Sequence, residues 1–287
     1  MAKTGLMSSV RDISDFIRLQ HTIFDLPFVW SGLVVASMGH YDLFKFVLVT
    51  AAAIFARATA MTLNRIEGRK YDQVNPRKKD WQLISGRFSV RFAILLSIIF
   101  ATMFELCVVF INTLVLELSP LVLFSFILDP ILKRFTSMRH FYMGFTIGVG
   151  VMAGYLSVIP AFPTSPLPYL ILAAASLWIA GFDMIYVIPD IETDRQNGLR
   201  TVMTDYGIEK GHDISILTHA ISFLCFVAIA FYIQYYLYYV VVAVIGMLMV
   251  LQHVTLRPGD LKSVRFSFLG ANSFVSIIFL AALVMSF

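Results

Sequence analysis

The sequence has little charge and almost no cysteine for its length. Only 14% of its 287 residues are charged, whereas 59% are hydrophobic and 26 are phenylalanine. The mean hydropathy of +0.80 is too high for an ordinary soluble domain. The only two cysteines, Cys107 and Cys225, lie in apolar stretches and exclude a disulfide framework or a cysteine metal site. This composition indicates an integral membrane protein.

Apolar stretches recur along the chain, each long enough to cross a hydrocarbon core of about 30 Å as a helix. We therefore predict an all-α polytopic membrane protein in which residues 1–287 form a single membrane-embedded domain. About nine transmembrane helices are expected, so the termini are expected on opposite sides of the membrane. The predicted spans are residues 22–39, 43–63, 92–111, 113–132, 141–160, 167–188, 214–233, 236–253 and 268–286.

Lysine and arginine are distributed unevenly between the predicted loops. All of them except Lys45 and Arg57 fall on the face that holds the N-terminus. In membrane proteins the cytoplasmic loops carry the excess of these residues. We therefore expect a multi-pass protein of the plasma or bacterial inner membrane, with a cytoplasmic N-terminus and cytoplasmic charged loops. The lipid bilayer is an expected partner, and no nucleic acid is expected.

The first polar cluster lies at the cytoplasmic end of the second span. Arg57 and Asn64 are about 20° apart on a helix of 100° per residue, so both are expected to face the bundle interior. Glu67 and Asp72 follow closer to the surface. The basic run at residues 77–79 is expected to set the topology or to contact anionic lipid.

The second polar cluster lies at the end of the sixth span. On a continuous helix Asp183, Asp190 and Asp194 would lie within about 40° of one another. Three like charges at a membrane helix end are costly unless cations bind them, and Mg²⁺ prefers such oxygen ligands. Pro189 is expected to open the last turn. A solvated helix end paired with nearby basic residues is the alternative, but it does not explain the deeper Asp183.

Other charged groups show no clear pattern. Lys133 and Arg134, at the end of the fourth span, fit a topogenic cluster as well as a site. We assign no role to Asp25, Glu105 and Glu117. Acids and arginines inside a membrane also mark ion pathways, so a transporter or channel is a competing class. That class predicts polar groups near the midplane of several spans, whereas here they gather at one rim.

Together these motifs resemble the UbiA-type superfamily of intramembrane prenyltransferases, in its 4-hydroxybenzoate polyprenyltransferase-like branch. The resemblance covers essentially the full chain and implies nine transmembrane helices with Asp-rich motifs after helices two and six. The first motif is carried by Asn64, Asp72, Arg77, Leu83 and Gly86. The second is carried by Gly181, Phe182, Asp183, Tyr186, Asp190, Asp194, Gly198 and Leu199. The branch is indicated by residues 21–28, 57–65 and 75–77.

One position departs from the first motif. Its middle aspartate is replaced by Gly68, with Glu67 one residue earlier. We expect the helix to end near Gly68, so that Glu67 can reach back and supply the missing carboxylate. A non-catalytic homologue that binds prenyl lipids is the alternative.

The resemblance implies a Mg²⁺-dependent aromatic polyprenyltransferase. It would move a polyprenyl chain from polyprenyl diphosphate to an aromatic acid, 4-hydroxybenzoate or a hydroxynaphthoate, in ubiquinone or menaquinone biosynthesis. The implied catalytic residues are Asp72, Asp190 and Asp194. The implied Mg²⁺ ligands are Asp72, Glu67, Asn64, Asp190 and Asp194. The implied diphosphate-binding residues are Arg57, Lys133 and Arg18, and the substrate pocket includes Asp183 and Tyr186.

Overall fold

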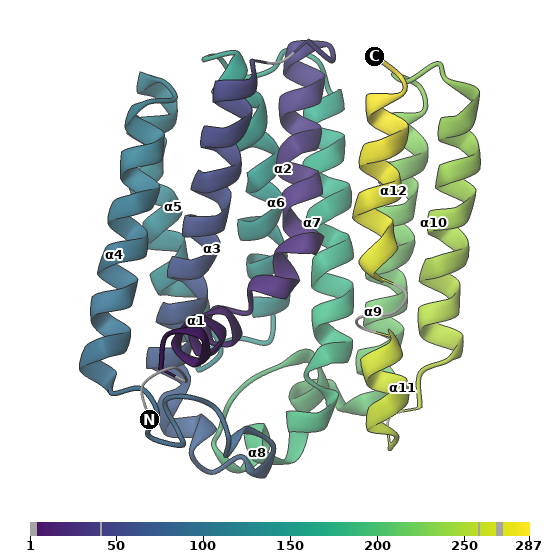
Figure 1. Ribbon diagram of the computed structural model, residues 1–287. Helices are drawn as coiled ribbons and strands as arrows, with labels where there is room; N and C mark the ends of the chain where they lie inside the picture. The colour runs from purple at the N-terminus through teal and green to yellow at the C-terminus, as the bar shows by residue number, and fades with distance from the viewer. Residues whose placement is uncertain (1–4, 41, 258, 268–271) are drawn as a thin grey trace.

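The computed structural model describes residues 5–40, 42–257, 259–267 and 272–287. Lys3 and the start of the last predicted span, residues 268–271, lie outside the described residues. Within the described part of the chain the secondary structure is helical and contains no strand. Figure 1 shows long helices running side by side, with α1 (Gly5–Phe16) lying across one end of the bundle and the C-terminus at the other.

Over the described residues, each predicted span overlaps one helix. These helices are α2 (Thr22–Ser37), α3 (Leu43–Asp72), α4 (Val90–Val109), α5 (Thr113–Leu132), α6 (Arg139–Val158), α7 (Leu167–Tyr186), α9 (Val202–Ile229), α10 (Tyr236–Val254) and α12 (Asn272–Val284). Short helices at the connections are η1 (Leu19–His21), η2 (Pro76–Lys78), η3 (Ile188–Asp190), α8 (Ile191–Gln196) and α11 (Leu261–Arg265).

The all-α polytopic membrane fold is therefore confirmed. Over the described residues, seven helical segments are long and apolar enough to cross a bilayer. The helices α2, with 16 residues, and α12, with 13, are shorter. The count of nine spans stays a prediction.

Side-chain caps satisfy the first amide groups of several helices. Asp42 accepts a hydrogen bond from the Phe44 amide at 3.0 Å, and Asn112 accepts one from the Val115 amide at 3.0 Å. An unpaired amide is costly where a membrane excludes water. These polar residues therefore mark where α3 and α5 begin.

The helices α2 and α6 approach so closely that their backbones touch. A Cβ added to Gly32 would lie 1.8 Å from the carbonyl oxygen of Val151, and one added to Gly154 would lie 1.9 Å from that of Val29. Small residues allow such contacts between membrane helices, where packing replaces the hydrophobic effect as the driving force. This contact fixes α2, which forms one wall of the cavity described below.

The prediction that the first Asp-rich segment leaves the helix near Gly68 is wrong. Helix α3 continues to Asp72, with Arg69 and Lys70 in its last turn. Glycine costs about 1 kcal/mol in a helix interior. The two basic side chains offset part of this cost because cations favour the negative end of the helix dipole.

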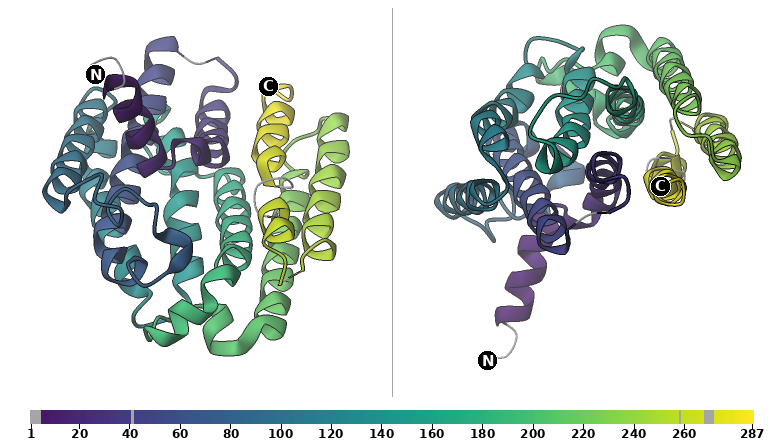
Figure 2. Two further views of the ribbon diagram at one scale, coloured as in Figure 1. Left: turned by 60° about the horizontal axis from the view of Figure 1, so that its bottom comes forward. Right: turned by 90° about the horizontal axis from the view of Figure 1, so that it is seen from above.

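The second Asp-rich segment is interrupted, as Pro189 predicts. The α-helix α7 ends at Tyr186, η3 follows, and α8 begins at Ile191. Asp183 therefore lies on a different helix from Asp194, and the prediction of one continuous stripe is wrong. Figure 1 and the left view of Figure 2 place α8 and the connection after α3 at the same end of the bundle. We call this the charged end.

Candidate active site

A cavity of about 770 Å³ joins the charged end to the apolar interior of the bundle. Polar residues of α3, α7 and α8 line it at the charged end. The rest of the wall is mainly apolar, and it includes Val49, Ala52, Ala56, Val108, Val122, Phe126, Val149 and Leu156. Phe162 and Tyr169, which follow the far end of α6, also line the cavity. The cavity thus combines a charged mouth with an apolar body that extends through the bundle.

Asp190 is buried at the mouth and is contacted from the connection after α3. Its Oδ1 accepts hydrogen bonds from Asn75 Nδ2 at 2.7 Å and from Arg77 Nε at 3.1 Å. The Arg77 guanidinium also pairs with the second carboxylate oxygen. Lys78 Nζ lies 3.6 Å from Asp190 Oδ2. Arg77 and Lys78, predicted to be topogenic, are thus also part of this site.

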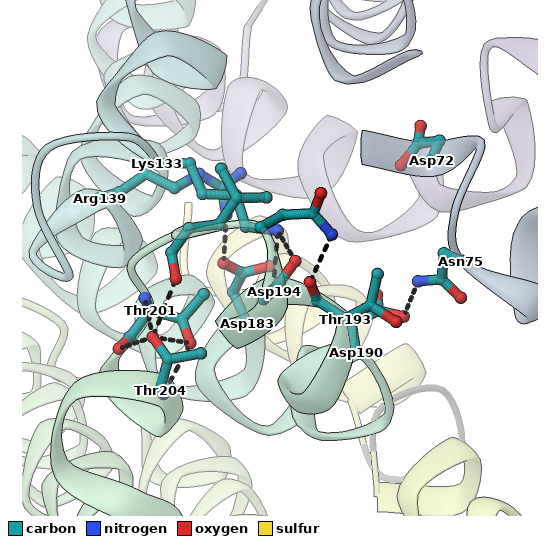
Figure 3. Close-up of polar contacts among 12 residues, drawn as sticks. Asp72, Asn75, Lys133, Arg139, Asp183, Asp190, Thr193, Asp194, Thr201 and Thr204 are labelled. Atoms are coloured by element: carbon teal, nitrogen blue, oxygen red, sulfur yellow. Dashed lines mark hydrogen bonds and ion pairs between the residues drawn. The ribbon is translucent and has the colours of Figure 1, made fainter. Parts of the chain in front are cut away.

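Lys78 brings the two Asp-rich segments together. Its ammonium group donates to Asp72 Oδ1 at 2.8 Å while it also pairs with Asp190. Figure 3 shows Asp72 on a separate element from the group formed by Asp183, Asp190 and Asp194. One cation therefore lies between carboxylates that are far apart in the sequence.

Asp194 is held by Lys133 at the end of α5. The Lys133 ammonium lies 2.9 Å from each carboxylate oxygen. Burial lowers the pKa of Lys133 from its ordinary value, and the carboxylate of Asp194 opposes that shift. The pair places a half-buried cation at the mouth.

Asp183 lies deeper and is the centre of a buried polar cluster. It accepts from Arg139 Nη1 at 3.3 Å and pairs with His140 Nδ1 at 2.7 Å. His140 Nε2 accepts the amide hydrogen of Val202 at 3.3 Å, so in the neutral ring the hydrogen is on Nδ1 and faces Asp183. Arg139 also contacts Asp129 at 3.4 Å. No pattern in the sequence identified Arg139 and His140.

The predicted inward orientation of Arg57 and Asn64 agrees with the structure, since both line the cavity. Arg57 forms an ion pair with Asp25 of α2, for which no role was expected from the sequence. Among the described residues, Arg57 Nε has no hydrogen-bond partner. A half-buried guanidinium paired with Asp25 thus lines the cavity well below its mouth.

Glu67 also lines the cavity, but its carboxylate forms an ion pair with Arg134. The neighbouring Gly68 leaves room for Asp72: a Cβ at position 68 would lie 3.3 Å from Asp72 Oδ2. The first Asp-rich segment therefore presents Asp72 to the second segment and turns Glu67 toward α5.

Three cationic side chains lie over the ring of Trp81 at the mouth. The Arg65 guanidinium carbon lies 3.5 Å from the ring centroid, Lys78 Nζ 4.9 Å and the Arg18 guanidinium carbon 5.4 Å. Such contacts between cations and an aromatic face are attractive. Three positive charges are thereby held against one aromatic ring, and one of them, Lys78, also pairs with Asp72 and Asp190.

The carboxylates at the mouth fit a magnesium ion that shares its coordination with a substrate. Among the described residues, no three His, Cys, Asp or Glu side chains converge to hold a metal by themselves. Mg²⁺ is usually bound by one or two carboxylates together with substrate phosphates and water. Asp72 and Asp190, which already share the Lys78 cation, have the oxygen donors for such an ion.

The comparison with known protein families agrees with this arrangement. The UbiA prenyltransferase family matches residues 26–281. The chain belongs to the UbiA prenyltransferase family. It is therefore a membrane prenyltransferase of that family, and the resemblance proposed from the two Asp-rich motifs is confirmed.

Solved structures of UbiA homologues share the fold. The apo structure of a UbiA homologue from Aeropyrum pernix is 30% identical, with a TM-score of 0.83 over 93% of this chain and 98% of that chain. The structure of an Archaeoglobus fulgidus UbiA homologue bound to DMAPP and Mg²⁺ is 18% identical, with a TM-score of 0.76 over 95% of this chain and 97% of that chain.

Curated relatives of this UbiA-family chain include enzymes named 4-hydroxybenzoate octaprenyltransferase. The protein from Francisella tularensis subsp. novicida is 26% identical over 222 residues, which cover 76% of this chain and 77% of the relative. The protein from Neisseria gonorrhoeae is 28% identical over 181 residues, which cover 63% of this chain and 60% of the relative.

Every residue that the sequence analysis placed in the site lines this UbiA-family cavity. They are Arg18, Arg57, Asn64, Glu67, Asp72, Lys133, Asp183, Tyr186, Asp190 and Asp194. Tyr186 faces Arg77, whose guanidinium carbon lies 5.8 Å from the ring centroid. Their roles as metal, diphosphate or substrate ligands stay predictions.

Proposed function

We propose that this protein transfers a polyprenyl chain from polyprenyl diphosphate to an aromatic acid, 4-hydroxybenzoate or a hydroxynaphthoate, in ubiquinone or menaquinone biosynthesis. The observation that carries the proposal is the cavity itself. Facing carboxylates and cations at its mouth suit a metal-bound diphosphate, and its long apolar body suits a polyprenyl tail. The mouth is proposed to face the cytoplasm of the plasma or inner membrane.

The relatives support both substrates. The proteins from Francisella tularensis and Neisseria gonorrhoeae are named for 4-hydroxybenzoate and an octaprenyl group. The Archaeoglobus fulgidus homologue was solved with DMAPP and Mg²⁺. A donor diphosphate, an aromatic acid acceptor and a magnesium ion are therefore consistent with the chemistry of the site.

At the mouth, we assign the diphosphate to the facing Asp-rich segments. Asp190 and Asp194 would hold one Mg²⁺, and Asp72 with Glu67 or Asn64 a second. Bound Mg²⁺ would neutralise charge that grows on the diphosphate as its bond to the prenyl carbon breaks.

Several basic side chains would assist at the mouth. Lys133, Arg18 and Lys78 can donate to phosphate oxygens from the same rim. The Tyr186 ring, also in the cavity wall, would face the allylic cation.

Deeper in the cavity, we assign Arg57 to the acceptor carboxylate in place of the diphosphate role expected from the sequence. Arg57 precedes Asp72 by fifteen residues on one continuous helix, a rise of about 22 Å. An arginine at that depth is better placed for an acid below the diphosphate. Among the described residues its Nε has no hydrogen-bond partner, so Asp25 alone does not satisfy this guanidinium.

The test uses the full-length protein in lipid nanodiscs with a labelled polyprenyl diphosphate, Mg²⁺ and a set of aromatic acids. We expect prenylated 4-hydroxybenzoate or hydroxynaphthoate, and no product from benzoate, which lacks the activating hydroxyl. Arg57→Gln should raise KM for the acid by about tenfold or more, since a charge-assisted hydrogen bond is lost. Arg87→Gln, at an exposed arginine, is the matched control. Binding of the diphosphate without transfer to any acid would instead identify a prenyl-lipid-binding homologue.

A further inference from the structure

Two basic residues of the cavity wall have no acidic partner among the described residues. Every acid of this wall that the structure describes forms an ion pair. The cations of these pairs are Arg57, Arg77, Lys78, Lys133, Arg134 and Arg139. The basic residues of the wall that remain are Arg18 and Arg65. Within the described chain, the cavity therefore has two positive charges that form no ion pair.

Arg65 is buried and is held by an aromatic ring. Its exposed fraction is only 5%. Its guanidinium carbon lies 3.5 Å from the ring centroid of Trp81, and its Nε donates to the carbonyl oxygen of Phe16 at 3.4 Å. Burying a cation away from water is costly, and an aromatic face offsets only part of that cost. A bound anion would offset the rest, so Arg65 is suited to receive one.

Arg18 meets the same ring from a strained turn. It lies between α1, which crosses the charged end (Figure 1), and η1, and its backbone is left-handed, with φ 52° and ψ 48°. Such a conformation is unfavourable for a residue with a Cβ, and it persists where neighbouring contacts enforce it, often at functional sites. The preceding Phe16 is fixed by Arg65 and by Phe88, with ring centroids 5.3 Å apart. The turn thus leaves the Arg18 guanidinium carbon 5.4 Å from the Trp81 centroid.

Trp81 also brings these arginines close to the carboxylates at the mouth. Lys78 Nζ lies 4.9 Å from the ring centroid and donates to Asp72 Oδ1 at 2.8 Å. Arg65 precedes Asp72 by seven residues on α3, a rise of about 10 Å. Its guanidinium covers much of that distance, because it reaches the ring that Lys78 also contacts. All three cations therefore lie within 5.4 Å of one point beside the mouth.

We propose that Trp81 is a positioning residue that holds Arg18 and Arg65 as a metal-independent binding site for the diphosphate of the prenyl donor. This inference rests on the proposed function. A guanidinium over an aromatic face keeps its N–H groups in its own plane, where they can donate to phosphate. These hydrogen bonds are charge-assisted and can be bidentate. The arginines on Trp81 then bind the diphosphate on the side away from the carboxylates assigned to the metal.

Anionic lipid headgroups carry the same phosphate chemistry. The burial of Arg65 and its place in the cavity wall favour a ligand inside the cavity. The test therefore uses nanodiscs of phosphatidylcholine, which has no net negative charge, so that added pyrophosphate is the source of anionic phosphate.

The experiment measures binding of inorganic pyrophosphate to the full-length protein by calorimetry, with EDTA present and no metal. The wild type should bind. Trp81→Leu should weaken binding by about tenfold because the cation–π contacts are lost, whereas Trp81→Phe, which keeps an aromatic face, should weaken it by less than about threefold. Trp30→Leu is the matched control, since Trp30 is also half-buried but does not line the cavity. It should bind as the wild type does.

Two further measurements separate positioning from a purely structural role. Arg18→Gln should also weaken pyrophosphate binding, and adding Trp81→Leu to it should cost clearly less than Trp81→Leu alone costs, because the ring acts through the arginines. With Mg²⁺, Trp81→Leu should raise KM for the prenyl diphosphate and leave KM for the aromatic acid unchanged.

The outcomes separate this inference from the proposed function. Pyrophosphate binding that depends on Trp81, in a protein that prenylates no acid, supports the anion site and overturns the proposed function. A wild type that binds no pyrophosphate without metal overturns the inference, and so does equal affinity in the wild type and a folded Trp81→Leu. Strictly additive losses from Trp81→Leu and Arg18→Gln would also overturn it. If Trp81→Leu does not fold, the affinity of Arg18→Gln decides, and an affinity equal to wild type overturns the site.

Discussion

The two Asp-rich segments face the same cavity but are held in different ways. The second segment has three buried carboxylates: Asp183, Asp190 and Asp194 are 6%, 5% and 3% exposed. Each contacts cations from other elements of the bundle. In the first segment only Asp72 is comparably buried, whereas the Glu67 side chain is 33% exposed and turned toward Arg134.

The two segments therefore differ in how firmly the rest of the bundle holds their acids. The second is fixed by its interrupted helix and by partners from α5, α6 and the connection after α3. The first is one continuous helix end, and each of its two acids, Glu67 and Asp72, has a single cationic partner among the described residues. We therefore expect substitutions in the second segment to have the larger effects.

The largest effect is expected for the acids of the second segment. Asp190→Asn and Asp194→Asn should each reduce Mg²⁺-dependent turnover by about 100-fold or more, since a charged ligand at the leaving group is lost. Product formation at saturating substrate measures this effect. Glu192→Gln, at an exposed acid of the same short helix, is the control. Near-normal turnover in both Asp variants would contradict the assignment of this segment to the metal.

A smaller effect is expected for His140, which holds Asp183. Asn can place an amide donor near the position of Nδ1, whereas Gln places its amide near Nε2. Because the contact with Asp183 is the short one, at 2.7 Å, His140→Asn should be active and His140→Gln should lose about 10-fold in turnover.

The matched pair of His140 variants also tests why the residue matters. If His140→Asn and His140→Gln reduce turnover equally, turnover depends on the size of the imidazole ring and does not need the hydrogen bond to Asp183. The apparent Mg²⁺ affinity of both variants, measured by activity titration, shows whether Asp183 acts through the neighbouring acids.

The sequence predicted the parts of this site that depend on local pattern. Apolar length located the helices, and the Asp-rich spacing located Asp190 and Asp194. Pro189 correctly indicated the interruption after α7. These features are encoded within a few helical turns and need no knowledge of the tertiary packing.

The partners of these acids could not be predicted in the same way. Arg77 and Asp190 are 113 residues apart, and Lys133 and Asp194 are 61 apart. Spacing within one helix carries no information about such contacts. The path of the chain at Gly68 was also mispredicted, because glycine weakens a helix by only about 1 kcal/mol and packing can override it.

A further test concerns how Glu67 acts in the first segment. Glu67→Gln removes the partner of Arg134 and any contribution to a metal, so the apparent Mg²⁺ affinity should fall by about tenfold, or 1.4 kcal/mol. The double variant Glu67→Gln, Arg134→Gln separates the two causes. Full recovery in the double variant would show that Glu67 only neutralises Arg134 and is not a ligand.

The smallest effect is expected at Gly68, where the two segments differ most in sequence. Gly68→Ala should raise helix stability by somewhat less than about 1 kcal/mol, because the new Cβ would lie 3.3 Å from Asp72 Oδ2. Turnover should stay close to wild type. Gly68→Asp adds a like charge one turn from Asp72 and should lower stability by a few tenths of a kcal/mol without Mg²⁺. Thermal unfolding with and without Mg²⁺ distinguishes them: only the Asp variant should gain stability from the ion beyond the wild-type gain. Equal responses of both variants to Mg²⁺ would mean that the first segment needs no second carboxylate.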